Sequence, residues 1–379
     1  MSDSVFENLF ERKSMSAKTL VTGRETMTSK ERVRAFFSHQ PVDRVPIDAL
    51  WNPGILHKTM EYFGVKTEIE LKKSLGCDFQ AVSVNYVGPK LHADITGKFV
   101  DSIFGWHTRE IQHESGSYFD YCDFPLANAG VDEVAAWPIA SPDDFDYDLL
   151  PARCEEYKDF GLYTGGPGLP DVINSAGCIR GVEQVLIDLI TDEPAGVLLF
   201  KRMADFKYQQ LAKILEVIGD RIDFIWMGED LGTQIAPMIS MDVFRKHILP
   251  VHKRFIDLAK KYNLPTMLHT CGSSSWAYED FINAGLSGVD TLQPEATNMS
   301  PKYLKQTFGG RLVFHGCIST TGKLTSGTPD EVREECRKTL EIMMPGGGYA
   351  LCPSHQIQDN TPLENVLAMY ETANKYGWY

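Results

Sequence analysis

Eight short apolar segments recur along the chain, and stretches with the spacing of amphipathic helices follow them. Strands that are apolar along most of their length are typical of a parallel sheet covered by helices. Eight strand–helix units predict an α/β chain folded as a closed (β/α)8 TIM barrel. An open doubly wound sheet is the alternative; its dinucleotide-binding form is disfavoured because no G-x-G-x-x-G follows an early strand. The segments lie at 43–50, 78–84, 161–166, 223–230, 265–272, 289–295, 311–317 and 348–355.

The predicted helices are clearest at three places. Residues 28–40 have apolar spacing after a cap at Thr28 or Ser29. Residues 240–262 carry an apolar stripe and a cationic C-terminal end. Residues 328–343 begin with a threonine cap and acidic residues in the first turn. We therefore expect helices between the strands, as a barrel requires.

The domain organisation follows from where this alternation starts and where it is interrupted. Residues 1–27 precede it and are interpreted as a helical N-terminal arm. Residues 28–379 are predicted to form a single barrel domain. Residues 94–145 interrupt it with glycines, aromatic residues and a two-residue alternation, which predicts a β-hairpin insertion after the second strand.

Composition limits the classes of partner. The chain has 379 residues and a formal net charge of -14, so a nucleic-acid partner is not expected. No segment reaches the roughly 18 uncharged apolar residues of a membrane helix, and the N-terminus lacks the apolar core of a signal peptide. The eight cysteines are spread along the chain. This spacing is typical of reduced cytoplasmic proteins rather than disulfide-rich secreted ones.

Polar residues follow most of the predicted strands. In a (β/α)8 barrel the catalytic groups lie at the carboxyl ends of the strands. We take Glu229 and His315 as candidate acid–base residues, although Glu229 could equally cap a helix and form a structural ion pair. Aromatic residues near these ends could line a pocket or belong to the core. The candidate substrate contacts are Trp51, Asn52, Asn85, Tyr86, Asp230, Gln293, Glu295 and Cys317.

The segment "LPTMLHTCG" suggests a metal site. In an extended segment, residues two apart point to the same side, so His269 and Cys271 could both face the barrel mouth. An imidazole and a thiolate are suitable ligands for Zn²⁺, and a catalytic zinc has three protein ligands. The third ligand could be His355 or Cys352, from "LCPSH" at the last strand, with Glu295 and Cys317 as further alternatives. The alternative is a buried cysteine beside a histidine that caps a strand end.

Several longer motifs resemble those of a known family. They are "RVRAFFSHQPVDRVP", "GEDLGTQIAPMIS", "HTCG", "GTPDEVREE" and "GGGYALCPSHQIQDNTPLENVLAMYE". Over residues 28–379 the chain resembles the uroporphyrinogen decarboxylase superfamily, and within it the zinc methyltransferases that work with corrinoid proteins. True decarboxylases of this kind carry an arginine-rich stretch after the first strand. Here no arginine occurs between Arg44 and Arg109, so porphyrinogen decarboxylation is disfavoured.

The resemblance implies a function and a ligand set. His269 and Cys271 match the first two zinc ligands of the methyltransferase branch, and His355 stands where relatives usually have a cysteine, with Cys352 three residues earlier. We expect a zinc-dependent methyltransferase that moves a methyl group between a small methylated substrate, with an aryl methyl ether as one candidate, and the cobalt of a corrinoid (cobalamin) on a partner protein. The alternatives are a methylcobamide:thiol methyltransferase, a metal-free decarboxylase and a non-catalytic carrier-binding barrel. The family also suggests a homodimer.

Overall fold

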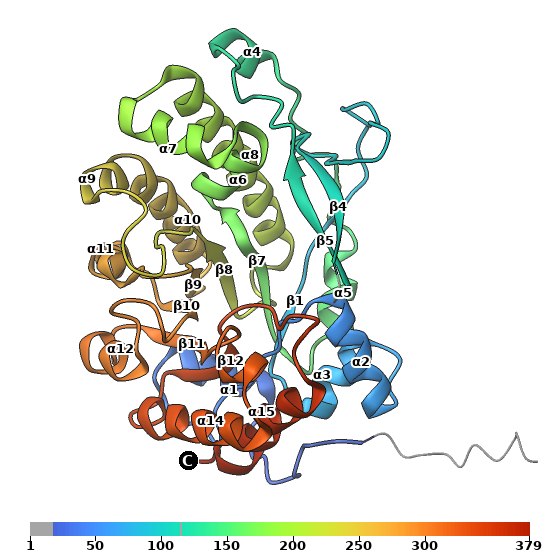
Figure 1. Cartoon of the computed structure of the whole chain (residues 1–379), viewed down its shortest axis with the longest axis vertical. Helices are drawn as coiled ribbons and strands as arrows, with labels where there is room; N and C mark the ends of the chain where they lie inside the picture. Colours follow the sequence, from blue (N-terminus) through green and yellow to red (C-terminus); the bar gives the residue numbers. More distant parts are fainter. Residues whose placement is uncertain (1–17, 114–115) are drawn as a thin grey trace, which may run out of the picture.

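The computed structural model describes residues 18–113 and 116–379, so most of the predicted N-terminal arm lies outside the described residues. A seven-stranded sheet forms the centre of the molecule, with its strands in sequence order and every neighbouring pair parallel (Figure 1). The strands are β1 (Phe79–Ala81), β7 (Gly161–Pro170), β8 (Phe224–Gly228), β9 (Thr266–His269), β10 (Gly288–Leu292), β11 (Val313–Ile318) and β12 (Tyr349–Pro353).

The first predicted strand, 43–50, is present as a bonded segment rather than as a regular strand. Ile47 pairs in parallel with Leu351 of β12. On the other side, the Ile47 carbonyl accepts the N–H of Asp78, which precedes β1. Pro46 has no N–H to donate, so the segment cannot form a full ladder. The segment nevertheless joins the two edge strands, which confirms the predicted barrel architecture.

Helices surround this sheet, as expected for an α/β barrel (Figure 1). The predicted helices at 28–40 and 328–343 are observed as α1 and α14, each with a threonine capping box. The helix predicted at 240–262 is divided by a π-turn at Phe244–Ile248, just before Pro250, whose missing N–H prevents the regular α-helical bond. The helices are α1 (Ser29–Phe37), α2 (Pro53–Phe63), α3 (Glu68–Leu75), α4 (Val131–Ala136), α5 (Leu150–Glu156), α6 (Val172–Arg180), α7 (Val182–Thr191), α8 (Pro194–Ile218), α9 (Met241–Val243), α10 (Leu249–Lys261), α11 (Tyr278–Ala284), α12 (Pro301–Phe308), α13 (Lys323–Ser326), α14 (Pro329–Met343) and α15 (Leu363–Tyr376).

The predicted insertion is confirmed as a small antiparallel sheet between β1 and β7. It contains β3 (Phe99–Val100), β4 (His107–His113) and β5 (Gly116–Cys122), and β4 and β5 form the hairpin. Two further short strands, β2 (Asn85–Tyr86) and β6 (Phe145–Asp146), pair with each other. The Phe104 ring lies edge-on to Phe206 of α8, with ring centroids 5.2 Å apart, so the insertion packs against the outer helices.

The inside of the barrel has an aromatic floor. One buried cluster contains Phe79, Tyr163, Phe224 and Trp226 together with residues of α1. Helix α1 thereby closes one end of the barrel. Phe79 and Phe224 meet edge to face with ring centroids 5.9 Å apart. Such packing excludes water. Polar groups next to this floor therefore sit in a medium of low dielectric constant.

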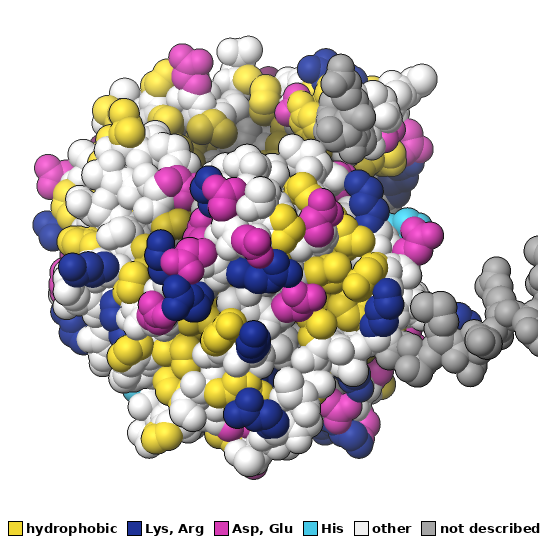
Figure 2. Space-filling view, turned by 60° about the horizontal axis from the view of Figure 1, so that its bottom comes forward, with side chains coloured by type: hydrophobic (Ala, Val, Ile, Leu, Met, Phe, Trp, Pro, Cys, Tyr) yellow, Lys and Arg dark blue, Asp and Glu magenta, His cyan; other side chains and the backbone are white. Residues whose placement is uncertain are grey.

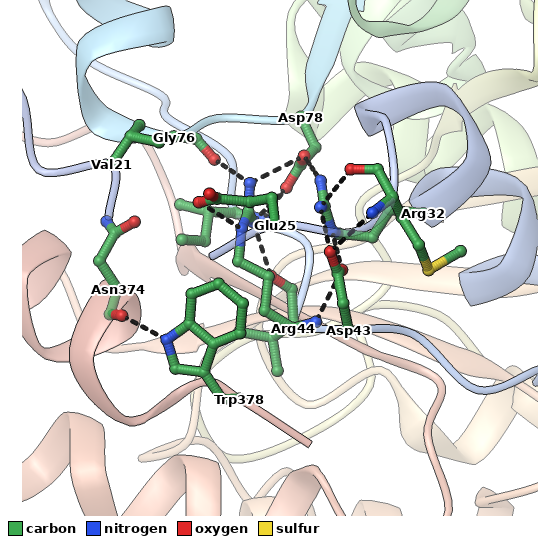
Figure 3. Close-up of polar contacts among 12 residues, drawn as sticks. Val21, Glu25, Arg32, Asp43, Arg44, Gly76, Asp78, Asn374 and Trp378 are labelled. Carbon is green, nitrogen blue, oxygen red and sulfur yellow. Dashed lines mark hydrogen bonds and ion pairs between the residues drawn. The ribbon is translucent and has the colours of Figure 1, made fainter. Parts of the chain in front are cut away.

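An ionic network ties α1, the 43–48 segment and the start of β1 together (Figure 3). Arg32 donates to Asp43 at 2.7 Å and to Asp78 at 2.6 Å. Arg44 donates to Asp78 at 2.7 Å. All four side chains are buried or nearly so. Buried guanidinium and carboxylate groups tolerate this setting only when they are paired, so the network fixes how the first segment meets the barrel.

The surface in Figure 2 carries intermixed acidic, basic and apolar side chains. On α14, Arg337 pairs with Glu334 and Glu341, and Arg333 pairs with Glu371 of α15. Exposed pairs of this kind contribute little to stability because water and salt screen them. None of the helices in the described part of the chain is long and apolar enough to span a bilayer.

Candidate metal centre

His269 ends β9 and is held by a carboxylate from the neighbouring strand. Its Nδ1 lies 2.8 Å from Oδ2 of Asp290 on β10, and the Thr291 hydroxyl also contacts the ring. Asp290 is fully buried. Since a carboxylate accepts hydrogen bonds, the Nδ1 of His269 is the donor, and its Nε2 keeps a free lone pair. A metal-binding histidine needs this tautomer.

Cys271 and His355 bring two further donors to this lone pair. The Cys271 Sγ lies 3.5 Å from His269 Nε2. The donor atoms of His269, Cys271 and His355 all lie within 4.8 Å of one another. Gly272 follows with a φ of +67°, and a Cβ there would lie 2.3 Å from the Gly232 carbonyl oxygen. Only glycine fits this turn, and the turn aims the cysteine at the histidine.

The electrostatics of the cluster suit a cation. Burial and the neighbouring Asp230 raise the pKa of the Cys271 thiol far above its usual range. Burial, followed by the neighbouring imidazole of His269, lowers the pKa of His355, which therefore favours the neutral imidazole. A thiolate at this position needs a nearby positive charge. Two imidazole nitrogens and one sulfur are a donor set typical of zinc, so these residues fit that ion.

The remaining predicted metal residue lies in a second group. The Cys352 Sγ lies with donor atoms of Asp48 and His315, all within 4.8 Å of one another and all buried. His315 donates Nδ1–H to Asp290 Oδ1 at 2.6 Å and Nε2–H to Asp48 Oδ2 at 3.2 Å. Burial opposes the charged form of His315, but the surrounding acidic groups outweigh it and hold the pKa of His315 well above its usual range.

Glu229, a candidate acid–base residue, contacts the start of α6. Its two carboxylate oxygens accept the backbone N–H groups of Val172 and Ile173, at 2.8 and 2.9 Å. His252 of α10 lies 2.9 Å from the same carboxylate. A negative charge at a helix N-terminus satisfies N–H groups that have no partner within the helix. The contacts of Glu229 are therefore those of the helix-capping alternative.

Two predicted substrate contacts support the turn that carries Cys271. Asp230 accepts the Cys271 N–H at 2.8 Å and the side-chain amide of Asn174 at 2.9 Å. Gln293 accepts the Gly272 N–H at 2.6 Å. These bonds fix the backbone of the turn at Cys271 and Gly272. They place both side chains next to the donor cluster.

The other predicted contacts make hydrogen bonds outside the cluster. Glu295 accepts from the hydroxyls of Ser319 and Thr321 and, with the buried Cys317, lines a cavity of about 890 Å³ beside α14. The remaining pairs are Trp51 Nε1 with Glu68, Asn52 with Gln358, Asn85 with Arg153, and the Tyr86 hydroxyl with the Pro89 carbonyl.

Asp290, Asp48 and His252 are site or supporting residues that the sequence reasoning missed. Asp290 and Asp48 each interrupt an apolar run, in "GVDTL" and "PIDAL". A charged residue in the middle of a buried strand is a signal, since burial requires a partner. The neighbouring residues in the sequence do not identify that partner. His252 lies within the predicted helix at 240–262 and carried no such signal.

Comparison with known proteins assigns the chain to a family. The family model described as uroporphyrinogen decarboxylase (URO-D) matches residues 179–376, about half of the chain, a range that includes the three donor residues and Asp290. The chain belongs to the URO-D family.

Relatives of this URO-D family member include methyltransferases. The methylcobamide:CoM methyltransferase MtbA of Methanosarcina acetivorans is 25% identical over 189 residues, covering 50% of this chain and 52% of MtbA. MtaA of Methanosarcina barkeri, another methylcobamide:CoM methyltransferase, is 29% identical over 139 residues, covering 37% of this chain and 38% of MtaA. The matched region thus spans about half the length of these curated relatives, or less.

A solved structure described as a methyltransferase from Methanosarcina mazei has the same fold. It superposes with a TM-score of 0.58 and 19% sequence identity, and the match covers 92% of this chain and 99% of that one. At this level of identity the similarity concerns the fold. It shows that the fold of that methyltransferase extends over almost the whole of this chain.

Proposed function

We propose that this URO-D family member is a zinc-dependent methyltransferase that moves a methyl group between a small substrate and the cobalt of a corrinoid on a partner protein. The observation that carries the proposal is the cluster of His269, Cys271 and His355, with donor atoms within 4.8 Å of one another. The printed names of the relatives MtbA and MtaA support methyl transfer that involves a methylcobamide.

The three donor side chains would hold the zinc ion. When bound, zinc supplies Lewis acidity at the sulfur or oxygen atom that gains or loses the methyl group. His269 offers Nε2 because its Nδ1–H donates a hydrogen bond to Asp290. Cys271 offers a thiolate, whose charge the buried surroundings disfavour in the absence of a cation. A site with three protein ligands leaves a coordination position for substrate.

The rest of the chain orients and shields this centre. Asp230 and Gln293 hold the backbone at Cys271 and Gly272. The aromatic floor of the barrel shields His315 and His269 from water on one side. The ring centroid of Trp226 lies 5.9 Å from that of His315 and 6.4 Å from that of His269. The proposal leaves two directions open: demethylation of a methyl ether, and methylation of a thiol.

Porphyrinogen decarboxylation is disfavoured by the positions of the arginines. A polyanionic tetrapyrrole needs guanidinium groups at the site. Arg44, in the first barrel segment at 43–50, is buried and bonded to Asp78. Arg32 is bonded to Asp43 and Asp78. Neither side chain is free to bind a carboxylated substrate.

The test combines metal analysis with methyl-transfer assays on the full chain. The variants are His269→Ala and Cys271→Ser, with His57→Ala, an exposed histidine on α2, as the matched control. We expect about one zinc per chain in the wild type and in the control, and loss of zinc and of transfer in the other two. Assays pair methylcobalamin with thiols and reduced cobalamin with aryl methyl ethers. A wild-type protein that stays free of zinc after refolding with it, or an activity that releases CO₂ and survives chelators, would contradict the proposal.

A further inference from the structure

Asp290 lies between two histidines at the centre of the barrel. One carboxylate oxygen accepts from His269 Nδ1 at 2.8 Å, and the other accepts from His315 Nδ1 at 2.6 Å. Asp290 is fully buried, and each of its two carboxylate oxygens faces one of the two imidazole rings. The orientation of the carboxylate is therefore set by both rings together.

His315 is in turn fixed from its far side. Its Nε2 donates to Asp48 Oδ2 at 3.2 Å, and the other oxygen of Asp48 accepts the backbone N–H of Ala49 at 2.8 Å. Phe79 and Trp226 lie edge-on to the His315 ring, with centroids 5.4 and 5.9 Å away. The ring has no freedom to rotate without breaking two charged hydrogen bonds in a dry environment.

We propose that Asp48 and His315 are positioning residues for the metal ligand His269, acting through Asp290. This inference rests on the proposed function, because it assigns a role to residues behind the proposed zinc site. The series of contacts runs Asp48–His315–Asp290–His269 and draws on the neighbouring strands β9, β10 and β11 and on the 43–50 segment across the barrel from them. It fixes the tautomer and the direction of the His269 ring, so that Nε2 faces the Cys271 sulfur at 3.5 Å. Groups that hold a metal-binding histidine in this way commonly change metal affinity by ten- to hundredfold when removed.

A second metal ion is the competing interpretation of the same residues. Asp48, His315 and Cys352 offer three donor atoms within 4.8 Å. A structural zinc site, however, takes four protein ligands, and this group supplies three. Both nitrogens of His315 already face carboxylate oxygens at hydrogen-bonding distance. These observations favour a hydrogen-bonded chain, and the experiment below includes the metal as an outcome.

The experiment measures zinc affinity in three variants of the full chain by competition with a chromogenic chelator. His315→Leu removes both hydrogen bonds, and His315→Asn keeps a side-chain N–H that can reach Asp290. Val313→Ala, on the same strand and in the buried cluster of the barrel floor, is the matched control for lost packing. We expect zinc affinity to fall about ten- to hundredfold in His315→Leu, to be largely restored in His315→Asn, and to stay at the wild-type level in Val313→Ala.

Cobalt substitution supplies a readout that a merely structural role would not change. The visible spectrum of Co²⁺ at the site reports the ligand geometry, and we expect it to shift in His315→Leu but not in Val313→Ala. Equal affinity and equal spectra in His315→Leu and wild type would overturn the inference while leaving the proposed function intact. A second equivalent of zinc that survives in His269→Ala and disappears in His315→Leu would overturn it too. A wild type that binds no zinc would instead defeat the proposed function.

Discussion

Buried charges occur at two levels of this barrel, and they are satisfied in different ways. At the α1 end, two arginines face two aspartates, and both guanidinium groups are engaged by carboxylates (Figure 3). In the barrel mouth, the hydrogen-bonded series Asp48–His315–Asp290–His269 leads to the donor cluster. The donor atoms of His269, Cys271 and His355 in this cluster lie within 4.8 Å of one another. The first arrangement is closed by its own opposite charges, whereas the second brings together lone pairs that the proposed zinc ion would satisfy.

This difference separates stability from function within one fold. Pairing of the arginine network replaces lost hydration and fixes the first segment against α1, so breaking it should reduce stability. In the donor cluster, ionisation of the Cys271 thiol is disfavoured and His355 favours its neutral form. A bound cation would stabilise the thiolate and accept the lone pair of the imidazole. Changes there should reduce metal binding more than folding, and the predictions below test this separation.

The largest expected effect is that of Asp78→Asn. Asp78 accepts hydrogen bonds from Arg32, from Arg44 and from the Ile47 N–H, and it is fully buried. The variant leaves two buried guanidinium groups short of a counter-charge, which costs about 3–5 kcal/mol of unfolding free energy. Urea denaturation measures this loss. Zinc content per folded molecule should stay at the wild-type level, and a parallel loss of zinc would break the proposed separation.

Next in size is Asp43→Asn, and its effect should depend on pH. Burial opposes ionisation of Asp43, but hydrogen bonds from Arg32 and from the Met27 and Thr26 N–H groups outweigh it and hold the pKa of Asp43 below its ordinary value of 3.8. The folded pKa is lower than the unfolded one, so this stabilisation is present above about pH 4 and is lost as the pH falls below that. We expect the variant to be less stable by about 1.5–3 kcal/mol at pH 7.

The control for Asp43→Asn is the wild type measured over the same pH range. The free energies of unfolding of the two proteins should converge as the pH falls from 5 toward 2. A difference that stays constant across this range would show that the charge of Asp43 plays no part in its contribution.

A comparable or smaller effect, confined to the mouth, is expected for His355→Ala. This variant removes one of the three converging donors, so zinc affinity should fall at least tenfold, or about 1.4 kcal/mol. Cys352→Ser, in the group with Asp48 and His315, should keep its zinc within about threefold, because its sulfur lies outside the donor cluster. Competition with a chelator measures both. The reverse result would make Cys352 the third ligand.

The strands and the His-x-Cys pair could be predicted from sequence because they depend on local periodicity. The apolar runs located the seven strands of the central sheet, and the two-residue spacing brought His269 and Cys271 to one side. The predicted first strand was only partly regular, since Pro46 limits its hydrogen bonding. The choice between His355 and Cys352 depended on where the last strand ends, and that is a matter of tertiary geometry.

The supporting residues could not be predicted because their partners are distant in sequence. His315 lies 25 residues from Asp290 and 267 residues from Asp48. Glu229 was singled out by a charge at the end of an apolar run, yet the same signal fits a helix cap and a catalytic acid. Only the positions of the Val172 and Ile173 N–H groups distinguish the two environments.

The smallest expected effect is that of Asp159→Asn, and it tests why the arginine network matters. Lys73 and Asp159 lie 2.8 Å apart, about the same distance as Arg44 and Asp78 at 2.7 Å. Their side chains are 51% and 64% exposed, against 4% and 0% for the buried pair. Water screens the exposed pair, so the variant should change the unfolding free energy by no more than about 0.5 kcal/mol. If urea denaturation gave a loss close to that of Asp78→Asn, distance rather than burial would govern these pairs, and the contrast between the two levels of the barrel would need another explanation.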